Sequence, residues 1–378
     1  MKSAKNNQPD YTLIAIVLVI IIFGLIMLSS ASSVIAYQNY HDSNYLWKHQ
    51  LFNGVLLGLV LMFIASKIQY LNWQKFAIPM LALTIFTLFM VLVSSAGISS
   101  GGATRWIDLG FFSFQPSELA KLTFIIYLAT WFSKKGKVMN DFAYGFVPFL
   151  VLLGIITLLI MMQPDLGTMT VIALVSVAVF FIAGGSIKNI SLIIAGGISL
   201  FAILIKIAPY RAARLSVFLN PELDPLGIGY HINQALLAIG SGGILGLGLG
   251  MSRQKYNFLP EATTDSIFAI IAEELGLIIS VLLIVLFAVL MIRGFKIARS
   301  APDQFGKLLA AGITCWFTIQ VIINVGAMVS ILPLTGIPLP FVSYGSSAIV
   351  ISMIAVGILI NISKHSAPVI AVNTRSRR

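Results

Sequence analysis

The sequence predicts an all-α polytopic membrane protein, with about ten transmembrane helices in a single integral membrane domain over residues 1–378. Hydrophobic residues make up 58% of the chain and charged residues only 10%, and the mean hydropathy is +0.97. A soluble domain carries roughly 25% charged residues. A chain with so little charge cannot cover a water-facing surface and must present apolar side chains to lipid.

Apolar stretches long enough to cross a hydrocarbon core of about 30 Å recur along the whole chain. The expected spans are 11–31, 48–66, 76–96, 117–133, 143–161, 168–184, 189–208, 267–291, 306–328 and 344–362. The first follows two lysines, as a signal peptide would. Its apolar run, Tyr11 to Leu28, is longer than a typical signal-peptide core of about 7–15 residues. We therefore expect an uncleaved first helix.

Ten crossings place both termini on one side of the membrane. That side holds 16 of the 24 basic residues, all in short loops and tails. An excess of Lys and Arg marks cytoplasmic loops, so both termini are expected in the cytoplasm. Topology then accounts for the net charge of +11, and we expect no nucleic-acid partner.

Three long connections are expected on the outer face. They are residues 97–116, a large loop at 209–266 between the seventh and eighth spans, and the proline-rich segment ILPLTGIPLPFVSYGSS. Irregular backbone at membrane depth is tolerated only against protein or a water-filled cavity. These segments therefore predict an outward-facing cavity framed by the helices.

Three charged residues lie where expected spans meet the outer face. Glu118 and Lys121 are spaced i, i+3 and can pair on one helix face. They form either a structural ion pair or the lining of a polar cavity that holds a charged group of a substrate. Asp165, in the turn MMQPDLGT, can cap the next helix or pair with Lys121.

The segment KYNFLPEATTDSIFAIIAEELG brings several acids to the start of the eighth span. Asp265 can be a plain helix N-cap. It can also be a ligand for a hard divalent cation, or a base if apolar surroundings raise its pKa. Glu273 and Glu274 follow about two turns deeper. At least one of these two must face protein or a cavity, because two carboxylates facing lipid would be very costly.

Several basic residues are expected on the outer side, either as headgroup anchors or as ligands for phosphate groups. They are Arg105, Arg211, Arg214, Arg253 and Lys255. The glycine run 241–250 lacks GxGxxG and the P-loop lysine, so we expect no nucleotide site. Cys315 is the only cysteine, which excludes an internal disulfide, and the histidine spacing does not fit zinc.

Taken together, these segments resemble the FtsW/RodA family of shape, elongation, division and sporulation proteins. The matching pieces are RWIDLGFFSFQPSELAKL, MQPDLGT, YRAARLSVFLNPELDPLGIGYHINQALLAIGSGG, GLGMSRQKYNFLPEATTDSIFAIIAEELG and LPLTGIPLPFVSYGSS. The chain departs from the family pattern at Thr263, Ser266 and Ser346. None of these departures removes an acid. The stretch GLGMSRQK is slightly more similar to division-type members, while DPLGIGYHINQ resembles elongation-type members too.

The resemblance implies ten transmembrane helices and a peptidoglycan glycosyltransferase in the bacterial cytoplasmic membrane. Its substrate would be lipid II, and undecaprenyl pyrophosphate would leave with inversion. The resemblance places the essential acid on Asp265, acting directly or through Mg²⁺ or Mn²⁺. A class B penicillin-binding protein and other divisome or elongasome membrane proteins would be its partners.

The same motifs assign roles to other residues. Glu118, Lys121, Arg105, Arg211, Arg214 and Lys255 would bind substrate, and Asp165, Glu261 and Glu274 would support the site. Two other functions stay open. One is a flippase for lipid-linked precursors, since intramembrane charges often mark transport paths. The other is a non-catalytic scaffold that activates a transpeptidase and would not need Asp265.

Overall fold

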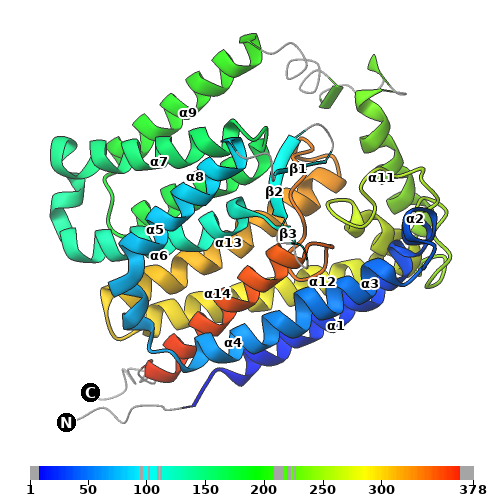
Figure 1. Ribbon diagram of the computed structural model, residues 1–378, viewed down its shortest axis with the longest axis horizontal. Coiled ribbons are helices and arrows are strands. Elements are labelled where there is room, and N and C mark those ends of the chain that lie inside the picture. Colours follow the sequence, from blue (N-terminus) through cyan, green and yellow to red (C-terminus); the bar gives the residue numbers. More distant parts are fainter. Residues whose placement is uncertain are drawn as a thin grey trace, which may run out of the picture.

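The computed structural model describes residues 8–93, 97–100, 103–108, 110, 113–207, 217–218, 223–224 and 227–366. Helices dominate these residues (Figure 1). The first half contains α1 (Tyr11–Ala31), α2 (Ser33–Tyr40), α3 (Tyr45–His49), the π-helical turn η1 (Gln50–Leu56), α4 (Leu57–Lys67), α5 (Tyr70–Val93) and α6 (Pro116–Lys135).

The second half of the chain continues the helical pattern. It contains the short turns η2 (Gly136–Asn140) and η3 (Phe142–Phe146), then α7 (Val147–Met161), α8 (Leu166–Ile182), α9 (Ile187–Ile207), α11 (Ile228–Gly242), α12 (Ile267–Ser300), α13 (Gln304–Met328) and α14 (Ser346–His365). Each of the ten expected spans overlaps a helix. The loop expected at 209–266 contains α11, so it is not irregular throughout.

Seven helical segments in the described ranges are long and apolar enough to cross a membrane. They are Tyr11–Ala31, Tyr45–Lys67, Tyr70–Val93, Phe142–Met161, Ile267–Ser300, Gln304–Met328 and Ser346–His365. The apolar parts of α8 and α9 are shorter, and α6 carries charged residues at both ends. The protein is thus a multi-pass membrane protein, while the count of ten crossings stays a prediction.

One part of the fold is not helical. Strands β1 (Gly97–Ser100), β2 (Ala103–Asp108) and β3 (Ser113–Phe114) form an antiparallel sheet in the order β1-β2-β3. The sequence predicts an all-α fold with an irregular connection here, and the sheet shows that the fold class is not purely α. The sheet ends directly before α6, so it fixes where Glu118 enters the bundle.

The core of the bundle lies around α6, α13 and α14. Nearly every side chain of α14 and most of α13 are buried, and α13 contacts α6, α8, α12 and α14. Helix α6, the least apolar expected span, is also largely buried. Its polar residues are tolerated because its neighbours are protein rather than lipid.

The first and last described helices are tied together at one end of the bundle (Figure 1). The backbone N–H of Asp10 donates to Ser363 Oγ at 3.0 Å. The Asp10 carboxylate caps α1 through the N–H of Leu13 and pairs with Arg293 of α12 at 2.6 Å. The start of α1 and the end of α14 therefore lie on the same side, as an even number of crossings requires.

Helix α12 is broken at Gly276, whose φ of 74° favours glycine. The glycine run 241–250 fills the break. Leu247 and Gly248 donate backbone N–H groups to the carbonyls of Glu273 and Glu274, at 3.0 and 2.9 Å. The run is therefore a closely packed segment at the depth of the α12 break, with its backbone satisfied by protein.

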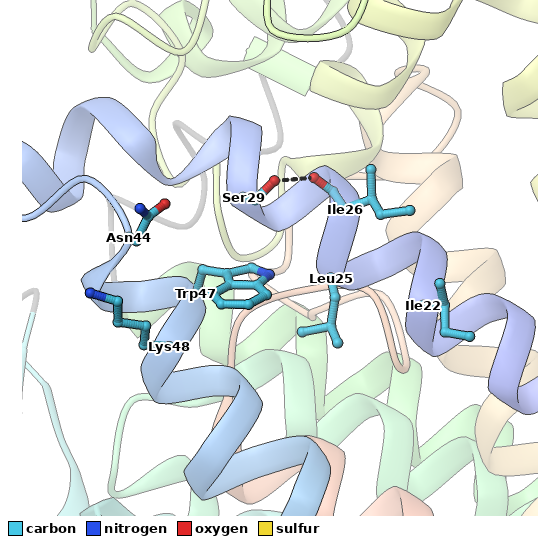
Figure 2. Close-up of a pocket in the computed structure, with 7 residues that line it drawn as sticks. All are labelled: Ile22, Leu25, Ile26, Ser29, Asn44, Trp47 and Lys48. Carbon is cyan, nitrogen blue, oxygen red and sulfur yellow. Dashed lines mark hydrogen bonds between the residues drawn. The ribbon is translucent and has the colours of Figure 1, made fainter.

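A groove of about 470 Å³ opens between α1 and α3 (Figure 2). Leu25, Ile26 and Trp47 line its apolar part, and Lys48 lies at its rim. Lys48 pairs with Asp42 at 2.8 Å, and both side chains are substantially exposed. The groove is distinct from the acids of the outer loop, and a surface of this apolar character in the bundle wall suits hydrocarbon chains of the bilayer.

Candidate functional site

Asp265 lies at the entrance to α12, and its side chain is only 7% exposed. The N-cap position of α12 is Ser266, and no side chain caps that helix end. The interpretation of Asp265 as a plain N-cap is therefore wrong. The cause is the preceding turn, in which the Glu261 carbonyl accepts the N–H groups of Thr264 and Ser266, each at 3.1 Å.

The backbone around Asp265 is held by three successive carbonyls. The Thr263 carbonyl accepts from the Tyr344 N–H at 2.8 Å, and the Thr264 carbonyl accepts from the Ser343 hydroxyl. The Asp265 carbonyl accepts from Asn324 Nδ2 at 2.7 Å. The proline-rich segment and α13 therefore fix the loop from behind.

Asp265 has no cationic partner within the described ranges of the chain. None of the ion pairs between described residues includes Asp265. Its carboxylate lies 3.4 Å from Thr264 Oγ1, whose single proton is donated to Glu261 Oε2 at 2.6 Å, and the backbone N–H groups of Asp265 and Ser266 favour its ionised form. Burial, and then the negative charge of Glu261, raise the pKa of Asp265 to about 7.

Glu118 and Lys121 do form an ion pair. Lys121 Nζ lies 2.8 Å from Glu118 Oε1, with both side chains buried. The ammonium also donates to Gln320 Oε1 at 3.3 Å and lies 5.1 Å from the centre of the Trp316 ring. The cavity beside Lys121 has about 10 Å³, which is room for about one water.

The contacts of Lys121 with Glu118 and Gln320 favour the alternative of a structural ion pair. The Glu118 Oε2 atom is buried without a hydrogen-bond partner among the described residues, and the role of the pair as the lining of a substrate cavity stays a prediction. The pairing of Asp165 with Lys121 does not occur, since Lys121 pairs with Glu118. Asp165 instead caps α8, where its Oδ1 accepts the N–H of Thr168 at 3.0 Å, as the turn sequence predicts.

Lys255 forms a second buried ion pair, with Glu274 Oε1 at 3.0 Å. Its ammonium also donates to Ser30 Oγ at 3.0 Å and to the Gly250 carbonyl at 2.6 Å. These three acceptors use the three donors of an ammonium group. The geometry therefore disfavours the expected role of Lys255 in substrate binding and gives Glu274 a supporting one.

Glu273, directly before Glu274, also faces protein. Its carboxylate accepts the N–H of Arg253 at 2.9 Å and the hydroxyl of Ser252. Both glutamates of α12 are buried and together hold the 252–255 turn. The sequence required only one of them to face inward, and the structure turns both away from lipid.

The expected basic residues are dispersed. Arg105 of β2 donates to the carbonyls of Gln163 and Pro164, so it braces the turn before α8. The Arg253 side chain is exposed. Arg211 and Arg214 lie outside the described residues, and their expected contact with phosphates stays a prediction.

Two polar residues near Asp265 were missed by the sequence analysis. Gln320 and Asn324 are buried on α13 and spaced i, i+4. A glutamine and an asparagine one turn apart inside an apolar span are costly unless they bond to protein. That spacing was the available signal, and it points the two amides at the same neighbouring segment.

Few of the described side chains near Asp265 could be ligands for the expected divalent cation. No group of three or more His, Cys, Asp or Glu side chains that could hold a metal occurs in the described part of the chain. The Thr264 hydroxyl donates to Glu261 Oε2 at 2.6 Å and lies 3.4 Å from Asp265 Oδ1, so both carboxylates are close to one hydroxyl. Mg²⁺ keeps several waters and commonly uses one or two carboxylates with substrate phosphates, so these residues fit a partly hydrated cation.

Comparison with known proteins places the chain in a defined group. A family model described as "Cell cycle protein" for FtsW, RodA and SpoVE matches residues 10–367. Stage V sporulation protein E of Bacillus subtilis is 43% identical over 96% of this chain and 99% of its own length. A probable peptidoglycan glycosyltransferase FtsW of Geobacter sulfurreducens is 39% identical over 94% of this chain and 95% of its own.

Solved structures agree with the sequence relatives. A chain from a study of a peptidoglycan synthase complex, on coordination of polymerization and crosslinking, superposes with a TM-score of 0.77 at 25% identity, covering 94% of this chain and 98% of its own. The rod shape determining protein RodA of Thermus thermophilus gives 0.70 at 25% identity, covering 95% and 98%. With the family model spanning nearly the whole sequence, this chain belongs to the FtsW/RodA/SpoVE family.

Proposed function

We propose that this chain is a peptidoglycan glycosyltransferase that polymerises lipid II into glycan strands on the outer face of the cytoplasmic membrane, for cell division or elongation. The observation that carries the proposal is Asp265, a buried carboxylate at the entrance to α12 without a cationic partner among the described residues. Relatives that share nearly its whole length are called probable peptidoglycan glycosyltransferases.

Asp265 acts as the general base. It removes the proton from the 4-hydroxyl of the acceptor GlcNAc as that oxygen attacks the anomeric carbon of the donor strand. Undecaprenyl pyrophosphate leaves from the opposite face with the electron pair of the broken bond, which inverts the centre. A base is most effective when its pKa lies near the working pH, and burial raises the pKa of Asp265 to about 7.

A divalent cation, Mg²⁺ or Mn²⁺, fits the same loop. Asp265 and Glu261 would hold it, and the Thr264 hydroxyl, which donates to Glu261 Oε2, would orient that carboxylate. The cation would neutralise negative charge on the leaving pyrophosphate. Among the basic residues, exposed Arg253 and the outer arginines Arg211 and Arg214 are the candidates for the pyrophosphate, because Lys121 and Lys255 are engaged in buried pairs.

The membrane arrangement that suits this function has both termini in the cytoplasm and the 209–266 segment outside. The bias of basic residues supports this orientation, as does the joining of α1 and α14 at one end. A class B penicillin-binding protein is the proposed partner, with other divisome or elongasome proteins. The fold match to a chain of a peptidoglycan synthase complex supports it.

The two rival functions lose part of their basis. A flippase was favoured by charges along a path, but Glu118 and Lys121 are closed in by Gln320 and Trp316. A scaffold would not need a buried carboxylate whose pKa is raised to about 7. Translocation of labelled lipid II in liposomes without polymer would still favour the flippase.

The test is polymerisation of lipid II by purified protein with and without its transpeptidase partner, with products separated by size. Asp265→Asn should fold and yield no polymer. Asp165→Asn is the matched control, since it changes a buried outer carboxylate that caps α8, and it should keep activity in proportion to folded protein. Normal polymer from Asp265→Asn would refute the proposal.

A further inference from the structure

Helix α13 carries two buried amides that face the proline-rich segment before α14. Asn324 is 2% exposed. Its Nδ2 donates to the Asp265 carbonyl at 2.7 Å and to the Ile337 carbonyl at 2.8 Å. Both protons of one amide nitrogen are therefore used to join two segments that are far apart in the sequence.

The orientation of this amide is fixed by its partners. Both are carbonyls, which only accept hydrogen bonds, so the nitrogen must face them. The Asn324 oxygen is buried and has no hydrogen-bond partner among the described residues. A buried amide that leaves its oxygen unsatisfied is held by its two donated bonds, which makes those bonds its main role at this position.

Gln320 repeats the arrangement one turn earlier. Its Nε2 donates to the Pro338 carbonyl at 2.8 Å. Its Oε1 accepts from Trp316 Nε1 at 2.7 Å and from Lys121 Nζ at 3.3 Å. A continuous set of contacts therefore runs from the Glu118–Lys121 pair through Gln320 and the 337–338 backbone to Asn324 and Asp265.

We propose that Asn324 is a positioning residue for the reaction, which holds the Asp265 backbone against the 337–338 segment and so sets the direction of the Asp265 carboxylate. Gln320 acts in the same way on the next carbonyl and links that segment to Lys121. The buried ion pair thereby supports the reacting loop from a distance and does not touch substrate. This inference rests on the proposed function.

Asn361 supplies a matched control. It is 3% exposed and also joins two backbone segments, donating to the Ser66 carbonyl at 2.9 Å and accepting from the Tyr70 N–H at 2.9 Å. It lies on α14 near Ser363, which bonds to Asp10 at the opposite end of the bundle. A purely structural role predicts the same outcome for both asparagines.

The experiment compares Asn324→Ala, Asn361→Ala and Asp265→Asn in full-length protein with its transpeptidase partner, using lipid II as substrate. Thermal unfolding gives the folded fraction, and kcat and KM are measured per folded molecule. Misplacement of a reacting group by about 1 Å can lower the rate about 100-fold. Asn324→Ala should lower kcat at least tenfold with KM within twofold, and Asn361→Ala should leave kcat within twofold.

Equal kcat values for the two alanine variants would overturn the inference, as would a change in KM alone. If Asn324→Ala does not fold, Asn324→Ser keeps one donor and should show the same loss of kcat to a smaller degree, and an unchanged kcat there overturns the inference too. The proposed function fails separately, when Asp265→Asn makes polymer. Inactive Asp265→Asn beside fully active Asn324→Ala refutes only the role of Asn324.

Discussion

The Glu118–Lys121 pair and the Asp265 loop each contain a buried carboxylate, but the surroundings of the two carboxylates are opposite in charge. Glu118 lies 2.8 Å from an ammonium group, which a glutamine oxygen and an indole ring also contact. Asp265 has Glu261 for a charged neighbour and no cationic partner among the described residues. The first arrangement stabilises charge, and the second keeps a carboxylate available to take a proton.

This difference has a consequence for stability. The pKa of Asp265 is raised from 3.8 to about 7 in the folded protein, so the folded state binds the proton more tightly than the unfolded state. Folding stability contributed by this group therefore falls as pH rises between these values. Reacting groups are commonly held in environments that lower the stability of the folded protein. The Glu118–Lys121 pair, in which each charge has an opposite charge beside it, carries no such cost.

The largest expected effect on stability comes from breaking the Glu118–Lys121 pair. Lys121→Met leaves Glu118 buried without its cation and should lower the free energy of unfolding by about 3–5 kcal/mol. Thermal unfolding in detergent measures it. Adding Glu118→Gln to that variant should recover most of the loss, because both charges are then removed. No loss in the single variant would mean that the pair is not the structural element described here.

The Glu118–Lys121 pair and the cap of α8 could be predicted from the sequence, because both depend on the spacing of nearby residues. The i, i+3 separation of Glu118 and Lys121 predicted their pairing, and the turn before Leu166 predicted that Asp165 caps α8. Apolar length placed a helix in each expected span. These features follow from neighbours within one or two helical turns.

Features that depend on distant segments could not be predicted in the same way. One interpretation made Asp265 a plain cap of α12, but the Glu261 carbonyl accepts the N–H groups of Thr264 and Ser266 in the preceding turn. Lys255 was expected to meet substrate, but Glu274 and Ser30 approach it from other helices. The break at Gly276 requires the glycine run beside it. None of these contacts leaves a periodic pattern in the sequence.

A second prediction concerns the pH dependence of polymerisation. The base is active only when ionised, and the pKa of Asp265 is about 7. The rate per folded molecule should therefore fall about tenfold between pH 8 and pH 6. Saturating Mg²⁺ should shift this fall in rate to lower pH, because a cation favours the ionised carboxylate. A rate that is flat over this range at low Mg²⁺ would contradict the role of Asp265.

A smaller effect is expected at the cap of α8. Asp165→Ala removes the acceptor for the Thr168 N–H and should lower the free energy of unfolding by about 1 kcal/mol. Polymer yield per folded molecule should be unchanged. A loss of activity without a loss of stability would show that Asp165 acts in the reaction, as Asp265 does, and not only as a helix cap.

The smallest effect is expected at Glu261. Glu261→Gln removes the like charge that helps to raise the pKa of Asp265, while burial, the larger cause, is unchanged. The pH at which polymerisation is half-maximal should therefore fall, but it should stay above 3.8, the ordinary pKa of an aspartate. A move to higher pH would show that Glu261 does not act on Asp265 through its charge.

The most direct measurement takes Asp265→Asn and Lys121→Met together and records, in the same samples at pH 8, the thermal midpoint and the polymer made per folded molecule. Asp265→Asn should unfold at or above the temperature of the unmodified protein and make no polymer. Lys121→Met should unfold at a much lower temperature and still make polymer, with a partial loss per folded molecule because Lys121 supports the loop through Gln320. Polymer from Asp265→Asn, or a loss of stability in it matching that of Lys121→Met, would contradict the account.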